Sequence, residues 1–253
     1  MNKNPNDTAP GDPQERRYTI DIFCDFDGTI SPVDVGFGLF DRYGRQEPWN
    51  TMAEEGRIPI REYWRAMIAN LGQPLTRAMV DAFVRDLPFD PGINGLLEFA
   101  REEGIPFTVV SDGLDLYIER YLNLHGVACT TIVCNRAVLD GDEVRGISFP
   151  HAAEGCTCPS AVCKRNVVLA RARPQARIVY IGDGVTDYCP VRYADIIFAK
   201  GRLAAYCNAS RLPHYPFKSM ADVERQLRLL LERRRIRPRY QAALLRKSAW
   251  EEE

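Results

Sequence analysis

The sequence predicts an α/β protein with a Rossmann-like, mostly parallel sheet that is flanked by helices. Short runs of β-branched and aromatic residues alternate with segments of helical periodicity, which indicates βαβ units. A helical block at 34–90 follows directly after the first predicted strand, which indicates a small helical cap domain inserted there. The 253 residues suffice for one core domain with such an insertion.

The predicted strands are short apolar runs, most of which end at a polar residue or glycine. They are 19–24, 105–113, 130–135, 176–184 and 194–200. Residues 137–149 are predicted to form a hairpin around Asp140 and Gly141, because Asp-Gly is a favoured two-residue turn.

The predicted helices carry apolar residues three and four positions apart. In 60–72 this stripe stops at Gly72, and Thr76 is predicted to cap the next helix. Further helices are predicted at 93–104, 114–126, 160–173, 220–235 and 240–250.

The domain limits follow from these elements. Residues 1–17 are polar and rich in Pro, Asn and Asp, so we predict a disordered lead. The catalytic core is predicted to comprise 18–33 and 91–235, the helical cap 34–90, and a helical tail 236–253.

Composition argues against several classes of protein. Lys and Arg number 33 against 34 acidic residues, so a general nucleic-acid-binding role is not expected. The longest apolar runs are too short for a membrane span. The N-terminus has no apolar signal segment, which predicts a cytoplasmic protein with reduced thiols. The sequence does not indicate an oligomeric state.

Polar side chains follow three of the predicted strands. They are Asp25 with Asp27, Ser111 with Asp112, and Asp183 with Asp187. Ligands of open α/β sheets bind beyond the carboxyl ends of the strands, so these groups are expected to meet. Carboxylates gathered there repel one another unless a cation neutralises them, and Mg²⁺ prefers carboxylates together with phosphate oxygens. The pattern therefore predicts magnesium-dependent phosphoryl chemistry.

Individual roles can be assigned within this group. Asp25 is predicted to be a nucleophile that forms an aspartyl phosphate, and Asp27 the general acid and then base. The hydroxyls of Thr29 and Ser111 are predicted to donate to phosphate oxygens. Lys164, near a helix start, is predicted to supply a positive charge for the phosphate and the nucleophile.

The last two carboxylates complete the predicted site. Asp183 is predicted to bind Mg²⁺, and Asp187 to orient a metal-bound water or Lys164. Each motif alone also has a structural explanation, because DxDG often caps a turn or binds calcium and GDG is a common tight turn. The presence of four such motifs in this order argues against a purely structural explanation.

Four segments together resemble the haloacid dehalogenase superfamily of aspartate-nucleophile phosphatases. They are DFDGT at 25–29, VVSDG at 109–113, VCKRN at 162–166 and GDGVTD at 182–187. The resemblance covers about 19–232. It implies that the side chains of Asp25 and Asp183 and the backbone carbonyl of Asp27 hold Mg²⁺. It also implies that Asp112 and Gly113 join Ser111 in binding the substrate phosphate.

Within that superfamily the chain is most similar to the phosphoserine-phosphatase-like branch, and there to the 2-hydroxy-3-keto-5-methylthiopentenyl-1-phosphate phosphatases of methionine salvage. The similarity rests on CDFDGTI at 24–30, CNRAV at 134–138 and FPHAAEGCTCPSAVCK at 149–164. It implies a small phosphorylated metabolite as substrate. Phosphoserine, phosphocholine and phosphoryl transfer to another acceptor stay as alternatives, and a non-catalytic binding module predicts a missing motif residue, which is not found.

Asp34 lies nine residues after Asp25, where phosphoserine phosphatases carry a Glu that holds the substrate amine. A shorter acid reaches less far, which argues against phosphoserine. Asp34 is therefore either a specificity residue or the N-cap of the first cap helix.

Eight cysteines remain to be explained. One histidine and three of the thiols lie within 13 residues and form a candidate zinc set: His151, Cys156, Cys158 and Cys163. Free thiols in a loop and a Cys–Cys bridge are the alternatives. The other five cysteines are interpreted as structural residues. Five arginines at 233–239 indicate either a solvated helix end or a contact for an acidic partner.

Overall fold

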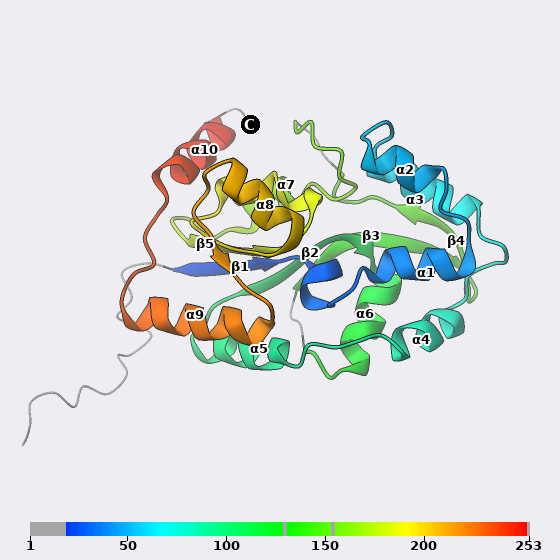
Figure 1. Ribbon diagram of the computed structural model, residues 1–253, viewed down its shortest axis with the longest axis horizontal. Coiled ribbons are helices and arrows are strands. Elements are labelled where there is room, and N and C mark those ends of the chain that lie inside the picture. The colour runs from blue at the N-terminus through cyan, green and yellow to red at the C-terminus, as the bar shows by residue number, and fades with distance from the viewer. Residues whose placement is uncertain (1–18, 129–130, 153–154, 252–253) are drawn as a thin grey trace, which may run out of the picture.

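A computed structural model describes residues 19–128, 131–152 and 155–251. The predicted lead 1–17 lies outside these residues. One seven-stranded sheet runs in the order β4-β3-β2-β1-β5-β6-β7 (Figure 1). The strands are β1 Ile20–Cys24, β2 Phe107–Leu114, β3 Thr131–Asp140, β4 Glu143–Ser148, β5 Arg177–Gly182, β6 Ile196–Ala199 and β7 Tyr215–Pro216. Only the β3–β4 pair is antiparallel among them, so the predicted fold class is confirmed.

Helices cover both faces of this sheet. They are α1 Val35–Tyr43, α2 Trp49–Glu54, α3 Ile60–Ala69, α4 Arg77–Arg85, α5 Gly92–Glu102, α6 Asp115–Leu124, α7 Lys164–Arg171, α8 Gly201–Ala209, α9 Met220–Glu232 and α10 Tyr240–Glu251. Short 3₁₀ helices occupy Val185–Asp187 and Pro190–Tyr193. The helix predicted at 160–173 begins four residues later, and α8 has no counterpart among the predicted helices.

The sheet separates two apolar cores, because successive side chains of a strand point to opposite faces. On one face Ile22 and Cys24 of β1 join a large cluster that includes residues of α5 and α9. On the other face Phe23 joins a second cluster that includes residues of α7 and α8. Figure 1 shows α5 with α9 on one side of the sheet and α7 with α8 on the other. Burial on both faces explains why β1 is apolar apart from Asp21, whose carboxylate pairs with Arg173 at 2.7 Å.

The block 34–90 contains α1 to α4, as the helical pattern predicts. Several hydrogen bonds tie it to the rest of the chain, including bonds between backbones far apart in sequence. The backbone N–H of Val144 in β4 donates to the carbonyl of Leu75 at 2.8 Å, and the N–H of Ile60 donates to the carbonyl of Pro159 at 3.0 Å. Its apolar side chains belong to the same cluster as Ile22. That the block is a separate cap domain stays a prediction.

The arginine run at 233–239 includes one anchoring residue. The guanidinium of Arg239 donates to the carbonyls of Ala194 at 2.9 Å and Val191 at 2.7 Å. The buried carboxylate of Asp195 accepts from the Arg239 backbone N–H at 2.9 Å and from Arg246 of α10 at 3.2 Å. These contacts hold the C-terminal helix against the sheet. Among the described helices, none combines the length and apolar character required to cross a membrane.

The connections place β1 in the middle of the sheet. From β1 the chain pairs with β2 on one side and with β5 on the other. In sequence order the strands run outward through β2 and β3 and then return to build β5 and β6 on the opposite side. The carboxyl end of β1 is therefore a topological switch point, where open α/β sheets bind their ligands.

Candidate active site

The chain leaves β1 through a sharp turn that carries the first motif. Asp25 is buried, and one carboxylate oxygen accepts the backbone N–H of Phe26 at 2.7 Å. Gly28 has φ +69°, a conformation that side chains rarely adopt. A Cβ on Gly28 would lie 2.5 Å from Oδ2 of Asp183. The glycine therefore permits the turn and also leaves room for the Asp183 carboxylate.

A buried ion triad joins three separate elements at this point. Nζ of Lys164, at the start of α7, lies 2.7 Å from Oδ1 of Asp25 and 2.8 Å from Oδ1 of Asp187. Lys164 is 1 % exposed and Asp187 is fully buried. Burial alone disfavours the ammonium ion, but the carboxylates of Asp187 and Asp25 more than offset this and raise the pKa of Lys164. Lys164 is therefore a permanent cation at the site.

Asp187 has no oxygen left for a further ligand. In addition to Lys164, Oδ1 accepts the hydroxyl of Tyr180 at 2.7 Å, and Oδ2 accepts the N–H groups of Asp183 and Gly184 at 3.0 Å each. The carboxylate thus fixes the loop after β5 and contacts Lys164. The predicted role of orienting Lys164 would use this contact, and it stays a prediction.

The carboxylates of Asp25, Asp183 and Asp187 offer oxygens that all lie within 4.8 Å of one another. Burial raises the pKa of Asp25 well above its ordinary value, and the nearby charges of Asp187 and Asp183 add to this while Lys164 opposes it. The pKa of Asp183 is also raised by burial. Hard oxygen donors with an excess of negative charge fit Mg²⁺, because a bound cation would return both groups to the ionised form.

Asp27 points into a different environment from Asp25. Its Oδ1 accepts the N–H of Val35 at 2.8 Å, and its Oδ2 accepts the hydroxyl of Tyr117 at 3.0 Å. Burial and the negative charge of Asp34 raise the pKa of Asp27 to about 8, although these hydrogen bonds oppose the rise. At neutral pH the group is therefore largely protonated, the state that a general acid requires.

The second motif packs beside Asp27. The hydroxyl of Ser111 lies 3.5 Å from Oδ2 of Asp27 and accepts the N–H of Gly113 at 2.9 Å. A Cβ on Gly113 would collide with the hydroxyl of Tyr117, so this position requires glycine. Ser111 and Gly113 thus lie next to the predicted acid.

Asp112 and Thr29 make contacts within the protein, and their phosphate contacts stay a prediction. Oδ1 of Asp112 accepts the N–H of Val162 at 2.5 Å, and burial raises the pKa of Asp112 to about 6. Asp112 therefore fixes the loop before Lys164. The hydroxyl of Thr29 donates to Oδ1 of Asp183 at 2.6 Å, so it orients that carboxylate here.

Asp34 is exposed and caps α1, because its Oδ1 accepts the N–H of Phe37 at 2.7 Å. This hydrogen bond is the contact that the N-cap alternative for Asp34 requires.

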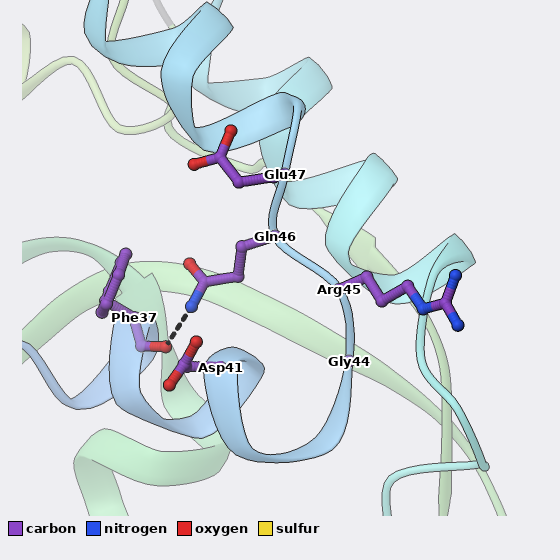
Figure 2. Close-up of a pocket in the computed structure, with 6 residues that line it drawn as sticks. All are labelled: Phe37, Asp41, Gly44, Arg45, Gln46 and Glu47. Carbon is purple, nitrogen blue, oxygen red and sulfur yellow. Dashed lines mark hydrogen bonds between the residues drawn. The ribbon is translucent and has the colours of Figure 1, made fainter.

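A hollow of about 360 Å³ opens further along the same block, between α1 and the segment leading to α2 (Figure 2). It is lined by Phe37, Asp41, Gly44, Arg45, Gln46 and Glu47. The side-chain amide of Gln46 crosses it to the Phe37 carbonyl at 3.1 Å.

The candidate zinc set is only partly assembled. The sulfurs of Cys156, Cys158 and Cys163 all lie within 4.8 Å of one another, but His151 is not a member of this group. His151 instead uses its backbone carbonyl, which accepts the N–H of Cys163 at 2.8 Å. The sequence pattern predicts a structural role for Cys189, but its sulfur lies 3.8 Å from the sulfur of Cys156.

Sequence reasoning also missed two tyrosines. Tyr117 and Tyr180 are buried and donate to Asp27 and Asp187 respectively. Tyr180 lies within the predicted strand at 176–184, two residues before the fourth motif. Its position next to that motif is a signal in the sequence that could have identified it. Tyr117 lies in a helix with no motif of its own, and only the fold brings it to Asp27.

Comparison with known proteins agrees with this geometry. The family model described as "Putative Phosphatase" matches residues 20–204. The chain belongs to this phosphatase family. It is similar to proteins named 2-hydroxy-3-keto-5-methylthiopentenyl-1-phosphate phosphatase. The relative from Geobacillus kaustophilus (strain HTA426) is 32% identical over 207 residues, which cover 80% of this chain and 92% of the relative. The relative from Geobacillus thermodenitrificans (strain NG80-2) is 31% identical over 214 residues, which cover 83% and 96%.

Solved structures share the fold. A substrate-bound phosphoserine phosphatase matches with TM-score 0.62 and 16% identity over 86% of this chain and 99% of that one. A HAD family hydrolase from Salmonella enterica serovar Typhi matches with TM-score 0.64 and 18% identity over 86% and 72%. The family shows that this chain is a phosphatase, and its fold is that of phosphoserine phosphatases and of a HAD family hydrolase.

The contact between Gly28 and Asp183 leads to a matched prediction. Gly28→Ala and Gly56→Ala place a Cβ at nearly equal φ values, +69° and +70°, but the Cβ at Gly56 meets no atom within 4 Å. Both variants are expected to lose about 1–2 kcal/mol of stability through backbone strain. Gly28→Ala alone is expected to lower kcat/KM by at least about tenfold, since it displaces Asp183. Phosphatase assays and denaturant unfolding measure both effects. Equal activity of the two variants would contradict this role of Gly28.

Proposed function

We propose that this enzyme hydrolyses a small phosphomonoester through an aspartyl-phosphate intermediate on Asp25, with Mg²⁺ as cofactor. The observation that carries the mechanism is the pairing at the end of β1. Asp25 lies 2.7 Å from the ammonium of Lys164, and the protonated Asp27 follows two residues later. Lys164 and a bound magnesium ion together would hold the first carboxylate as an anion, while its neighbour is an acid; these are the two states that displacement at phosphorus requires.

In the first half-reaction, a carboxylate oxygen of Asp25 attacks phosphorus as the bond to the leaving oxygen breaks. Asp27 gives its proton to that oxygen, so the product leaves as a neutral alcohol or enol. Lys164 balances charge on the nucleophile and on the phosphoryl oxygens. The hydroxyl of Ser111 would donate to the same oxygens.

In the second half-reaction, water attacks the aspartyl phosphate. Asp27, which lost its proton in the first step, takes one from the attacking water, and the Asp25–phosphorus bond breaks. Inorganic phosphate is released and both carboxyl groups return to their starting states. The hydrogen bonds from Val35 and Tyr117 hold Asp27 in place throughout.

Asp25 and Asp183 would hold the magnesium ion together with the backbone carbonyl of Asp27. When bound, the ion supplies charge neutralisation for the carboxylates and the phosphoryl group. Asp187 stays outside this ligand set, because its oxygens are engaged by Lys164, Tyr180 and two backbone N–H groups. Thr29 orients Asp183 through its hydroxyl.

We further propose 2-hydroxy-3-keto-5-methylthiopentenyl-1-phosphate as the substrate. The proposal is supported by relatives of that name that align with 80% or more of this chain. It is also supported by Asp34, which caps α1 through Oδ1 and is shorter than the Glu that holds the substrate amine in phosphoserine phosphatases.

Asp25→Asn is expected to lower kcat by at least about 10⁴-fold, because an amide cannot take the place of the nucleophile. Wild-type enzyme quenched in acid during turnover of radiolabelled substrate should carry phosphate that hydroxylamine removes, whereas the variant should carry none. Circular dichroism checks that the variant is folded, and Asp86→Asn, an exposed change remote from the site, is the control. Normal turnover by folded Asp25→Asn would exclude the mechanism.

The pH dependence of kcat/KM is expected to show an alkaline limb near the pKa of Asp27, about 8, because the acid is lost as pH rises through this value. The hydrogen bond from Tyr117 lowers that pKa. Tyr117→Phe is therefore expected to move the limb upward by about one pH unit, the equivalent of one hydrogen bond to a carboxylate. Tyr121→Phe, whose hydroxyl contacts the Pro88 carbonyl instead, is the control. A limb that stays in place in Tyr117→Phe would contradict the assignment.

The substrate proposal is tested by comparing kcat/KM for the methionine-salvage phosphate, phosphoserine and phosphocholine at saturating Mg²⁺. We expect the first to exceed the others by at least about 10²-fold, because specificity is set by differential transition-state binding. EDTA treatment should abolish activity, and added Mg²⁺ should restore it. A preference for phosphoserine would refute the substrate while leaving the mechanism in place.

A further inference from the structure

Four cysteine sulfurs gather beside the ion triad. The sulfurs of Cys158 and Cys163 lie 3.7 Å apart, and those of Cys156 and Cys189 lie 3.8 Å apart. Cys156, Cys158 and Cys163 also form a group with all sulfurs within 4.8 Å. Cys163 is buried and the other three are half-buried, and all four thiols are unbridged.

These spacings match one kind of site. Zinc bonds thiolate sulfur at about 2.3 Å, so sulfurs at the corners of a regular tetrahedron lie about 3.8 Å apart. A disulfide would bring two sulfurs to about 2.05 Å. The Cys158–Cys163 and Cys156–Cys189 distances both equal an edge of such a tetrahedron. Cys189 lies outside the group of three sulfurs that are all within 4.8 Å of one another, so a bound ion would draw Cys189 toward Cys158 and Cys163.

We propose that Cys156, Cys158, Cys163 and Cys189 bind one structural zinc ion. Four thiolates make a closed, soft ligand set of the type that structural zinc prefers. Cys189 takes the place that the sequence interpretation gave to His151. The backbone carbonyl of His151 instead accepts the N–H of Cys163 and so stabilises the loop that carries Cys156, Cys158 and Cys163.

The ion would connect the two segments that carry the Lys164–Asp187 pair. Cys163 immediately precedes Lys164 and is the N-terminal flanking residue of α7. Cys189 follows Asp187 by two residues and begins the 3₁₀ helix Pro190–Tyr193. A zinc ion bound to both would hold these backbones at a fixed separation, and hence the 2.8 Å contact between Lys164 and Asp187.

The loop also reaches the helical block. Pro159, between Cys158 and Cys163, accepts the N–H of Ile60 at the start of α3 at 3.0 Å. Arg165 extends across the same region, with its guanidinium 5.4 Å from the ring centre of Tyr193. A zinc ion bound by the four cysteines would therefore position Lys164.

The test measures metal content and not phosphatase activity. A negative result would therefore overturn the zinc proposal and leave the proposed reaction untouched. Full-length protein, expressed with zinc in the medium and purified with a thiol reductant but no chelator, is analysed by plasma mass spectrometry. We expect about one zinc per chain in the wild type. Cys207→Ser, which changes a buried cysteine of α8, and His151→Asn should retain it. Cys189→Ser and Cys158→Ser should lose most of it.

Cobalt replacement of the wild type gives a second measurement that does not depend on the folding of variants. The intensity of thiolate-to-cobalt charge-transfer absorption rises with the number of thiolate ligands, and four are expected. A zinc-free wild type that also binds no added zinc or cobalt would overturn the proposal. So would a three-thiolate spectrum with metal lost in His151→Asn, or a Cys156–Cys189 or Cys158–Cys163 disulfide in protein purified under reductant.

Discussion

Three carboxylates meet at the end of β1, and the buried ammonium of Lys164 holds two of them in contact. Burial of an ion costs several kcal/mol unless it is paired and hydrogen-bonded. Lys164 meets this requirement through Asp25 and Asp187, and Asp187 meets it through Tyr180 and two backbone N–H groups. One charge therefore fixes the start of α7, the end of β1 and the loop after β5 relative to one another. The turn that carries the predicted nucleophile depends on these relative positions.

The sequence predicted the strands of the central sheet well, because β1, β2 and β5 are buried on both faces and end at motif residues. It predicted α7 less well. Ala161 and Val162 continue the apolar spacing of the helix, but the N–H of Val162 pairs with the Asp112 carboxylate and Cys163 forms the true boundary. This competing contact is long-range and has no local signal. The absence of α8 from the prediction has a similar cause, since its small and polar residues carry little amphipathic pattern.

For the site, the motifs predicted which residues meet but not how their hydrogen bonds are distributed. Thr29 and Asp112 carry the residue types expected for phosphate contacts, yet in the fold they orient Asp183 and Val162. Tyr117 reaches Asp27 from another helix, and Cys189 reaches Cys156 across 33 positions. Such partners are set by the arrangement of elements in space, which spacing along the chain does not encode.

The hydrogen bonds between Asp27 and the start of α1 have a dynamic consequence. Two of the donors to its carboxylate, the N–H groups of Val35 and Gly36, belong to the first turn of the helical block. A displacement of α1 from β1 would remove these donors, but it would also expose Asp27 to water and carry Asp34 away, and burial and the charge of Asp34 are the two largest causes of the raised pKa of Asp27. The pKa of Asp27 would therefore fall as the block moves away and rise as it returns. Any such motion would be thermodynamically linked to proton release and uptake at the predicted acid, and each would bias the other.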